Sequence, residues 1–175
     1  MSVILGIDPG SRICGYGLVK ARGNQLDYIA CGVIKMGTLS FPERLDTIFS
    51  DISDIIAEHQ PDMVAVEEVF MGKNASSALK LGQARGAAIV ACTRQALPVA
   101  EYAARKIKQA VVGKGQAEKK QVQQMVKSLL GLSRVPVEDA ADALAVAICH
   151  ANTQHSLIRM AGVKSGRRGR LQGIK

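Results

Sequence analysis

Short hydrophobic runs alternate with polar turns along the first third of the chain, which is typical of a meander of β-strands. We expect strands over residues 3–8, 15–19 and 26–34, separated by turns that are rich in Pro, Gly, Ser and Asn. Two later apolar runs, which end at Val66 and at Tyr102, predict a fourth and a fifth strand. Such continuous apolar runs are expected for strands buried on both faces of a mixed sheet.

Hydrophobic positions three and four residues apart predict helices between and after these strands. The helices are predicted from Pro42 to just before Gln60, from about Ala75 to Ala96, around Arg105 to Lys108 before Gly113, from Ala117 to Leu130, and from Asp139 to about Asn152. The second helix is rich in Gly and Ala. Its small side chains fit either tight packing on the sheet or a self-association surface, and both remain open.

The chain has 175 residues, of which 47% are hydrophobic, and this suits one compact domain. We expect a domain over residues 1–155 and a basic, disordered tail over residues 156–175. No run approaches the roughly 20 apolar residues of a membrane span, and no basic segment precedes the first apolar run, so we expect a cytoplasmic protein without a secretory signal. The 4 widely spaced cysteines fit free thiols in a reducing compartment.

The formal net charge of +8 is distributed unevenly along the chain. Residues 1–70 carry 5 basic and 10 acidic side chains, whereas residues 71–127 carry 11 basic and 2 acidic ones. A surface formed by the second segment would attract a phosphate backbone. The alternative is a solvated basic face without a partner.

Four carboxylates stand where the ends of predicted elements would bring them together. Asp8 ends the first strand, Glu67 ends the fourth, and Asp139 and Asp142 lie three residues apart on one face of the last helix. Acids without Cys or His neighbours favour a hard cation such as Mg²⁺ or Mn²⁺. Taken singly, Asp8 could serve only a turn, and the two helical acids could serve only as helix caps. Four such coincidences together favour the metal site.

Two further features near the fourth strand bear on function. Glu67 and Glu68 are adjacent, so they point to opposite faces of an extended strand and only one of them can join the acidic cluster. Phe70 follows in a loop, in a chain with only 3% aromatic residues. It is either a core residue or a side chain that stacks on unpaired bases.

Several segments together resemble the RuvC family, the bacterial Holliday junction resolvases of the RNase H-like (retroviral integrase-like) superfamily. The resemblance covers residues 1–150 and rests on the segments Gly6–Arg12, Val66–Phe70, Lys80–Gly86, Glu101–Arg105, Val111–Gly113 and Asp139–Ala145. It implies an α/β fold with a five-stranded mixed sheet flanked by helices. It also implies a homodimer that makes Mg²⁺-dependent, symmetric paired nicks across a four-way DNA junction, and collaboration with the RuvA and RuvB branch-migration proteins.

The resemblance also assigns roles to residues of this chain. The family's catalytic and metal-binding acids fall on Asp8, Glu67, Asp139 and Asp142, its junction-probing aromatic on Phe70, and its DNA-contacting lysines on Lys108 and Lys119. The family often has Gln where this chain has Glu68. Four such acids would hold two Mg²⁺ ions about 4 Å apart, with Mn²⁺ as a substitute, and the nicks would carry ligatable 5′ phosphates.

Two other functions compete with this interpretation. The segment Asp8-Pro9-Gly10 also resembles the first phosphate loop of RNase H-like ATPases and sugar kinases, but those enzymes need a second lobe and a second glycine-rich loop, which these 175 residues do not show. A structure-selective DNA-binding module with non-catalytic acids is the other competitor. Cleavage assays of variants in the four acids would separate it from a nuclease.

Overall fold

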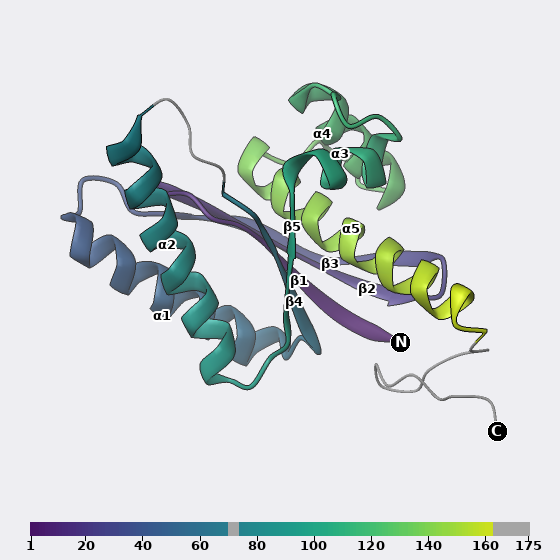
Figure 1. Cartoon of the computed structure of the whole chain (residues 1–175), viewed down its shortest axis with the longest axis horizontal. Helices are drawn as coiled ribbons and strands as arrows, with labels where there is room; N and C mark the ends of the chain where they lie inside the picture. The colour runs from purple at the N-terminus through teal and green to yellow at the C-terminus, as the bar shows by residue number, and fades with distance from the viewer. Residues whose placement is uncertain (70–73, 163–175) are drawn as a thin grey trace.

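The computed structural model describes residues 1–69 and 74–162, which form one mixed sheet between two helical layers (Figure 1). The strands are β1 (Ser2–Asp8), β2 (Ile13–Arg22), β3 (Gln25–Lys35), β4 (Met63–Glu67) and β5 (Val99–Tyr102). The helices are α1 (Phe41–His59), α2 (Ala75–Arg94), α3 (Ala104–Val112), α4 (Lys119–Leu129) and α5 (Glu138–Met160). In the described residues, the predicted five-stranded mixed sheet flanked by helices is thus confirmed.

The sheet has the strand order β3-β2-β1-β4-β5. Strand β2 is antiparallel to both β1 and β3, whereas β4 is parallel to both β1 and β5. Because β1 and β4 are central and parallel, their carboxyl ends meet at the same edge of the sheet. This edge brings together Asp8, which ends β1, and Glu67, which ends β4.

Two hydrophobic cores lie on the two faces of the sheet. Side chains such as Leu5 and Val64 pack under α1 and α2, and the next residues in each strand, such as Ala65, pack under α3, α4 and α5. Strands that are buried on both faces have no polar alternation. This explains why β1 and β4 appear in the sequence as continuous apolar runs.

Glycines in β1 and β2 let α5 approach the sheet closely. A Cβ atom at Gly6 would collide with the backbone carbonyl oxygen of Ala143, and one at Gly15 would collide with that of Asp139. The first half of α5 therefore lies directly on the two strands, next to the end of β1 at Asp8. The position of α5 places its first acidic residues beside the edge where β1 and β4 end.

The last helix is longer than the pattern predicts. It continues to Met160, whereas the polar residues near Asn152 suggest an end there. The Thr153 and Ser156 hydroxyls donate hydrogen bonds to carbonyl oxygens one turn earlier in the same helix, so polar residues are accommodated without ending it. Most of the predicted tail lies outside the described residues, and the division at residue 155 stays a prediction.

Among the described residues, 1–69 and 74–162, no helix combines the length and the hydropathy needed to cross a membrane.

Candidate active site

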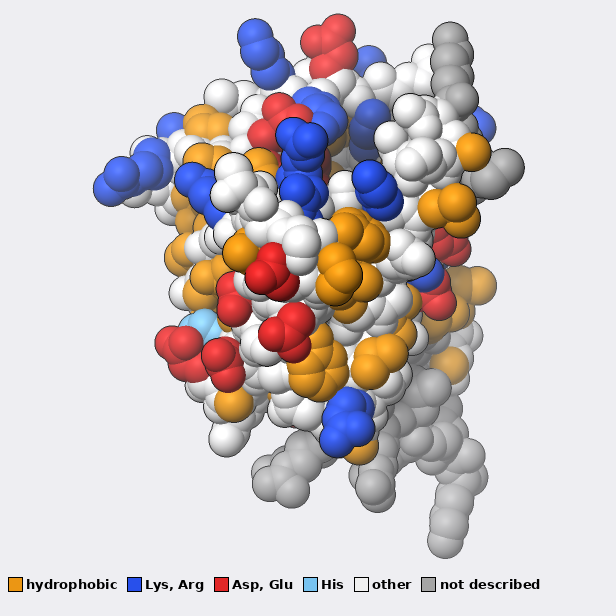
Figure 2. All heavy atoms as spheres, turned by 90° about the vertical axis from the view of Figure 1, so that its left-hand side faces the viewer, with side chains coloured by type: hydrophobic (Ala, Val, Ile, Leu, Met, Phe, Trp, Pro, Cys, Tyr) orange, Lys and Arg blue, Asp and Glu red, His pale blue; other side chains and the backbone are white. Residues whose placement is uncertain are grey.

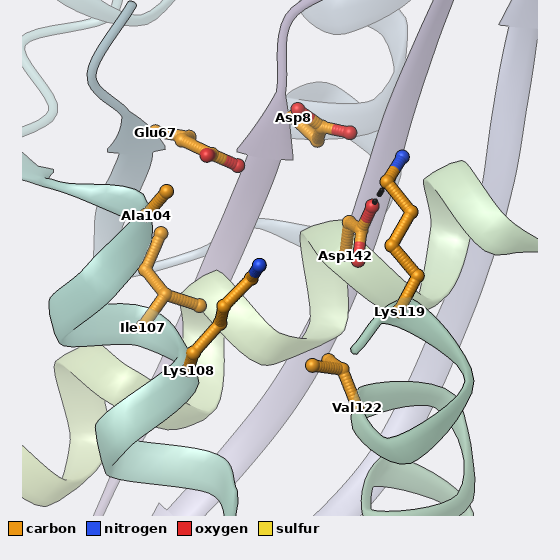
Figure 3. Close-up of a pocket in the computed structure, with 8 residues that line it drawn as sticks. All are labelled: Asp8, Glu67, Ala104, Ile107, Lys108, Lys119, Val122 and Asp142. Carbon is orange, nitrogen blue, oxygen red and sulfur yellow. Dashed lines mark ion pairs between the residues drawn. The ribbon is translucent and has the colours of Figure 1, made fainter. Parts of the chain in front are cut away.

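A pocket of about 300 Å³ opens where the carboxyl ends of β1 and β4 face α3, α4 and α5 (Figure 3). It is lined by Asp8, Glu67, Ala104, Ile107, Lys108, Lys119, Val122 and Asp142. Carboxylates come from the strand ends and from α5, and lysines approach from α3 and α4 (Figure 3). Five of the seven residues predicted for the site thus line one pocket.

Strand register places Asp8 and Glu67 side by side. Ile7 pairs with Val66 in the parallel ladder, so the residues that follow them are neighbours at the end of the sheet. Val66 belongs to the core under α1 and α2, and Glu67 therefore points to the opposite face, into the pocket. Glu68 does not line the pocket.

Of the two predicted acids on α5, only one lines the pocket. Asp142 lines it, whereas Asp139 does not. Asp139 is nevertheless close enough for its charge to raise the pKa of Asp8. The structure thus brings three of the predicted acids into the pocket wall and the fourth to its margin.

Burial and mutual repulsion disfavour negative charge on these acids. The pKa of Asp8 is raised from 3.8 to about 8, first by burial and then by the charges of Glu67, Asp142 and Asp139. Burial also raises the pKa of Glu67 and of Asp142, while Lys119 acts in the opposite direction on both. Buried carboxylates that repel one another are stabilised when a positive charge binds to them, either a proton or a metal cation.

Lys119 is held at the rim of the pocket by acids of α5. Its ammonium group forms an ion pair with Glu138 and lies 3.7 Å from a carboxylate oxygen of Asp142. The hydrogen bond to Glu138 is the main cause of its raised pKa. Glu138 was not predicted as a site residue, because an acid at the start of a helix also interacts favourably with the helix dipole and its sequence position alone does not indicate another role.

The fit of the pocket to a metal ion depends on its donors. In the portion of the chain that the structure describes, no three His, Cys, Asp or Glu side chains are already arranged as a metal-coordinating group. The donors are all carboxylate oxygens, which suit Mg²⁺ or Mn²⁺ and allow these ions to keep several waters. Together with the raised pKa of Asp8, this donor set fits a hard divalent cation that Asp8, Glu67 and Asp142 would hold.

Phe70 lies outside the described residues, so its predicted contact with unpaired bases stays a prediction.

The sheet order is that of the RNase H-like fold, and an acidic pocket lies at the ends of its central strands. The family model described as crossover junction endodeoxyribonuclease RuvC matches residues 4–150. The chain therefore belongs to the RuvC family.

Relatives of the family match nearly the full chain. The crossover junction endodeoxyribonuclease RuvC of Teredinibacter turnerae is 59% identical over 175 residues, which cover 97% of this chain and 99% of that protein. The protein of the same description from Photobacterium profundum is 60% identical over 171 residues, with the same coverage.

Solved structures agree with this membership. Thermus thermophilus RuvC in complex with a Holliday junction substrate is 34% identical, has a TM-score of 0.84, and matches over 89% of this chain and 96% of that chain. The yeast mitochondrial Holliday junction resolvase is 14% identical with a TM-score of 0.64, matches over 90% of this chain and 81% of that chain, and supports the fold alone.

Proposed function

We propose that this crossover junction endodeoxyribonuclease resolves four-way DNA junctions by metal-dependent hydrolysis of one phosphodiester in each of two symmetrically placed strands. The observation that carries the proposal is the pocket in which Asp8, Glu67 and Asp142 meet Lys108 and Lys119. Carboxylates of this kind hold cations, and lysines beside them hold the phosphates of the cleaved strand. A phosphate-transferring kinase would need a second lobe, for which the described residues offer no counterpart.

The residues of the pocket have distinct tasks in this proposal. Asp8, Glu67 and Asp142, with Asp139 at the margin, would hold two Mg²⁺ or Mn²⁺ ions. When bound, these cations supply the charge that activates water and stabilises the leaving oxygen. Water adds to phosphorus, the bond to the 3′ oxygen breaks, and that oxygen takes a proton, which leaves a 5′ phosphate and a ligatable nick.

The two lysines orient the DNA in the same proposal. Lys108 and Lys119 project into the pocket from separate helices, opposite the carboxylates of the strand ends (Figure 3). Each lysine can contact a phosphate next to the cleaved bond. This contact positions the strand and reduces the electrostatic repulsion between the strand and the acids. Ala104, Ile107 and Val122 form the apolar part of the pocket wall.

A synthetic four-way junction tests the function directly. Glu67→Gln removes a charge with little change of shape, so we expect loss of Mg²⁺-dependent cleavage with junction binding retained. Glu68→Gln is the matched control, because Glu68 does not line the pocket, and it should cut near the parent rate. The opposite result, with Glu67→Gln active and Glu68→Gln inactive, would reverse the assignment. A pair of inactive variants would implicate both acids.

Paired nicks require two active sites, and we propose that α2 provides the contact between two copies of the chain. Figure 2 shows exposed hydrophobic side chains on the face over α1 and α2, with Lys and Arg gathered in its upper part. On α2, Leu79 is 69% exposed and Val90 is 49% exposed, and a Cβ atom at Gly82 would meet nothing within 4 Å. Apolar residues beside an open glycine suit a two-fold interface.

Sedimentation of a variant tests this interface. Leu79→Glu places a charge on the exposed apolar face, so we expect the dimer to dissociate into folded monomers. Thr93→Glu, at an exposed position near the end of the same helix, is the control for charge alone. An unchanged dimer in Leu79→Glu would place the interface elsewhere.

The remaining features of the proposal follow from family membership. Phe70 would stack on an unpaired base at the crossover, RuvA and RuvB would deliver the junction, and the reaction would take place in the cytoplasm.

A further inference from the structure

Arg85 links α2 to the ends of two strands of the sheet. Its guanidinium forms an ion pair with Glu101 of β5, and its Nε donates a hydrogen bond of 3.3 Å to the backbone carbonyl oxygen of Glu67. The side chain of Arg85 is only 21% exposed. Arg85 comes from the layer of α1 and α2, whereas the side chain of Glu67 enters the pocket on the other face of the sheet.

The carbonyl group of Glu67 needs a donor from outside the sheet. The N–H of Glu68 donates to the carbonyl oxygen of Tyr102 in β5 over 2.9 Å, so the carbonyl of the same peptide unit points the other way, toward β1. In the parallel ladder, the next donor on β1 would be the residue after Asp8. That residue is Pro9, which has no N–H. Arg85 takes the place of the missing ladder donor.

The peptide unit between Glu67 and Glu68 is therefore held from both sides. Tyr102 fixes its N–H, and Arg85 fixes its carbonyl oxygen. This peptide carries the last residue of β4, and its orientation sets the direction in which the Glu67 side chain leaves the strand. Glu101, in turn, fixes the guanidinium on the neighbouring strand.

We propose that Arg85 is a positioning residue. It fixes the end of β4 from the α1–α2 side of the sheet and thereby directs the carboxylate of Glu67 into the pocket on the other side. The inference rests on the proposed function in so far as Glu67 is taken as a metal ligand. Lysine cannot replace arginine in this role, because a single ammonium group lacks the planar fork that serves a carboxylate and a carbonyl oxygen at once. Residues that support a metal ligand in this way typically change affinity or activity by about 10–100-fold when they are replaced.

Amide hydrogen exchange in the metal-free protein tests the positioning directly. In Arg85→Lys, we expect the Glu68 amide to exchange at least about tenfold faster, because its peptide unit has lost one of its two anchors. The Val64 amide, which donates to Pro98 at the other end of the same strand, should keep its rate. Equal acceleration at both amides would mean general destabilisation and would overturn the proposal, as would no change at Glu68.

Metal affinity gives a second readout that does not depend on cleavage. Calorimetric titration with Mn²⁺ should show affinity reduced by about tenfold in Arg85→Lys, with metal-free binding of the junction unchanged. Glu101→Gln keeps the bond to Glu67 and should have a smaller effect, and Arg94→Lys at the end of α2 is the matched control. Unchanged Mn²⁺ affinity, or loss of junction binding instead, would overturn the role. The exchange experiment remains informative even if the chain does not cut junctions.

Discussion

Replacing Asp8 by Asn should make the metal-free protein more stable at neutral pH, although it removes a candidate metal ligand. The carboxyl group is buried beside Glu67, Asp142 and Asp139, and its pKa is raised from 3.8 to about 8. Asparagine has the shape of a protonated aspartic acid and no charge to bury. The variant therefore avoids the cost of burying a negative charge, which destabilises the parent protein as the pH rises.

The pH window and the magnitude follow from this pKa. Below about pH 4, the carboxyl is protonated in both the folded and the unfolded chain. Between about pH 4 and pH 8, only the folded chain keeps the proton, so unfolding releases it and the stability of the parent falls as the pH rises. Up to pH 7 this amounts to at most about 4 kcal/mol, since a tenfold change in the protonation ratio corresponds to about 1.4 kcal/mol.

Urea unfolding in EDTA at several pH values between about 4 and 8 measures the difference. The stability curves of parent and Asp8→Asn should diverge as the pH rises, with the variant above the parent. Millimolar Mg²⁺ at the upper end of the range should stabilise the parent more than the variant, because it binds the folded carboxylates. Parallel curves, with a constant difference across the range, would refute the burial and repulsion on which the reasoning depends.

Two other predictions follow from the same structure. Lys108→Ala and Lys119→Ala should each lower the log-log slope of junction affinity against salt by about 0.9 per lost phosphate contact, whereas Lys20→Ala, at the far end of the sheet, should leave the slope unchanged. A slope that stays at the parent value would place the lysines away from DNA. Gly15→Ala should destabilise the fold by about 1–3 kcal/mol in urea unfolding, because its Cβ would displace α5 at Asp139. Wild-type stability would show that α5 has room to move.

The sequence was sufficient to predict the elements and the meeting of the strand ends. Strands buried on both faces leave continuous apolar runs, and the acids that follow two such runs, Asp8 and Glu67, are neighbours once the strands are parallel and adjacent. The choice of Glu67 over Glu68 was not available from alternation alone, because alternation says only that the two differ. It came from the family resemblance, and the packing of Val66 under α1 and α2 supplies the physical reason.

Contacts that depend on register or on backbone atoms leave no such pattern. Arg85 reaches the carbonyl oxygen of Glu67, 18 residues away, and any residue type offers that atom. Glu138 meets Lys119 only because α4 and α5 pack together, 19 residues apart in the chain. The long extent of α5 was missed for a related reason, since hydroxyl groups that bond within a helix cannot be distinguished in sequence from those that end it.

The close packing of α5 opposes the electrostatic repulsion among the acids of the pocket. This helix places Asp142 in the pocket and Asp139 at its margin, where their charges raise the pKa of Asp8, so the metal-free site opposes folding near neutral pH. The same helix has 11 buried residues, from Ala140 to Ala151, and it rests on glycines of β1 and β2 that allow no added carbon atom. Close packing along the helix thus holds the acids together where their charges would drive them apart. A rigid site of this kind is prepared for cations before they arrive, because little further ordering of the chain is needed when they bind.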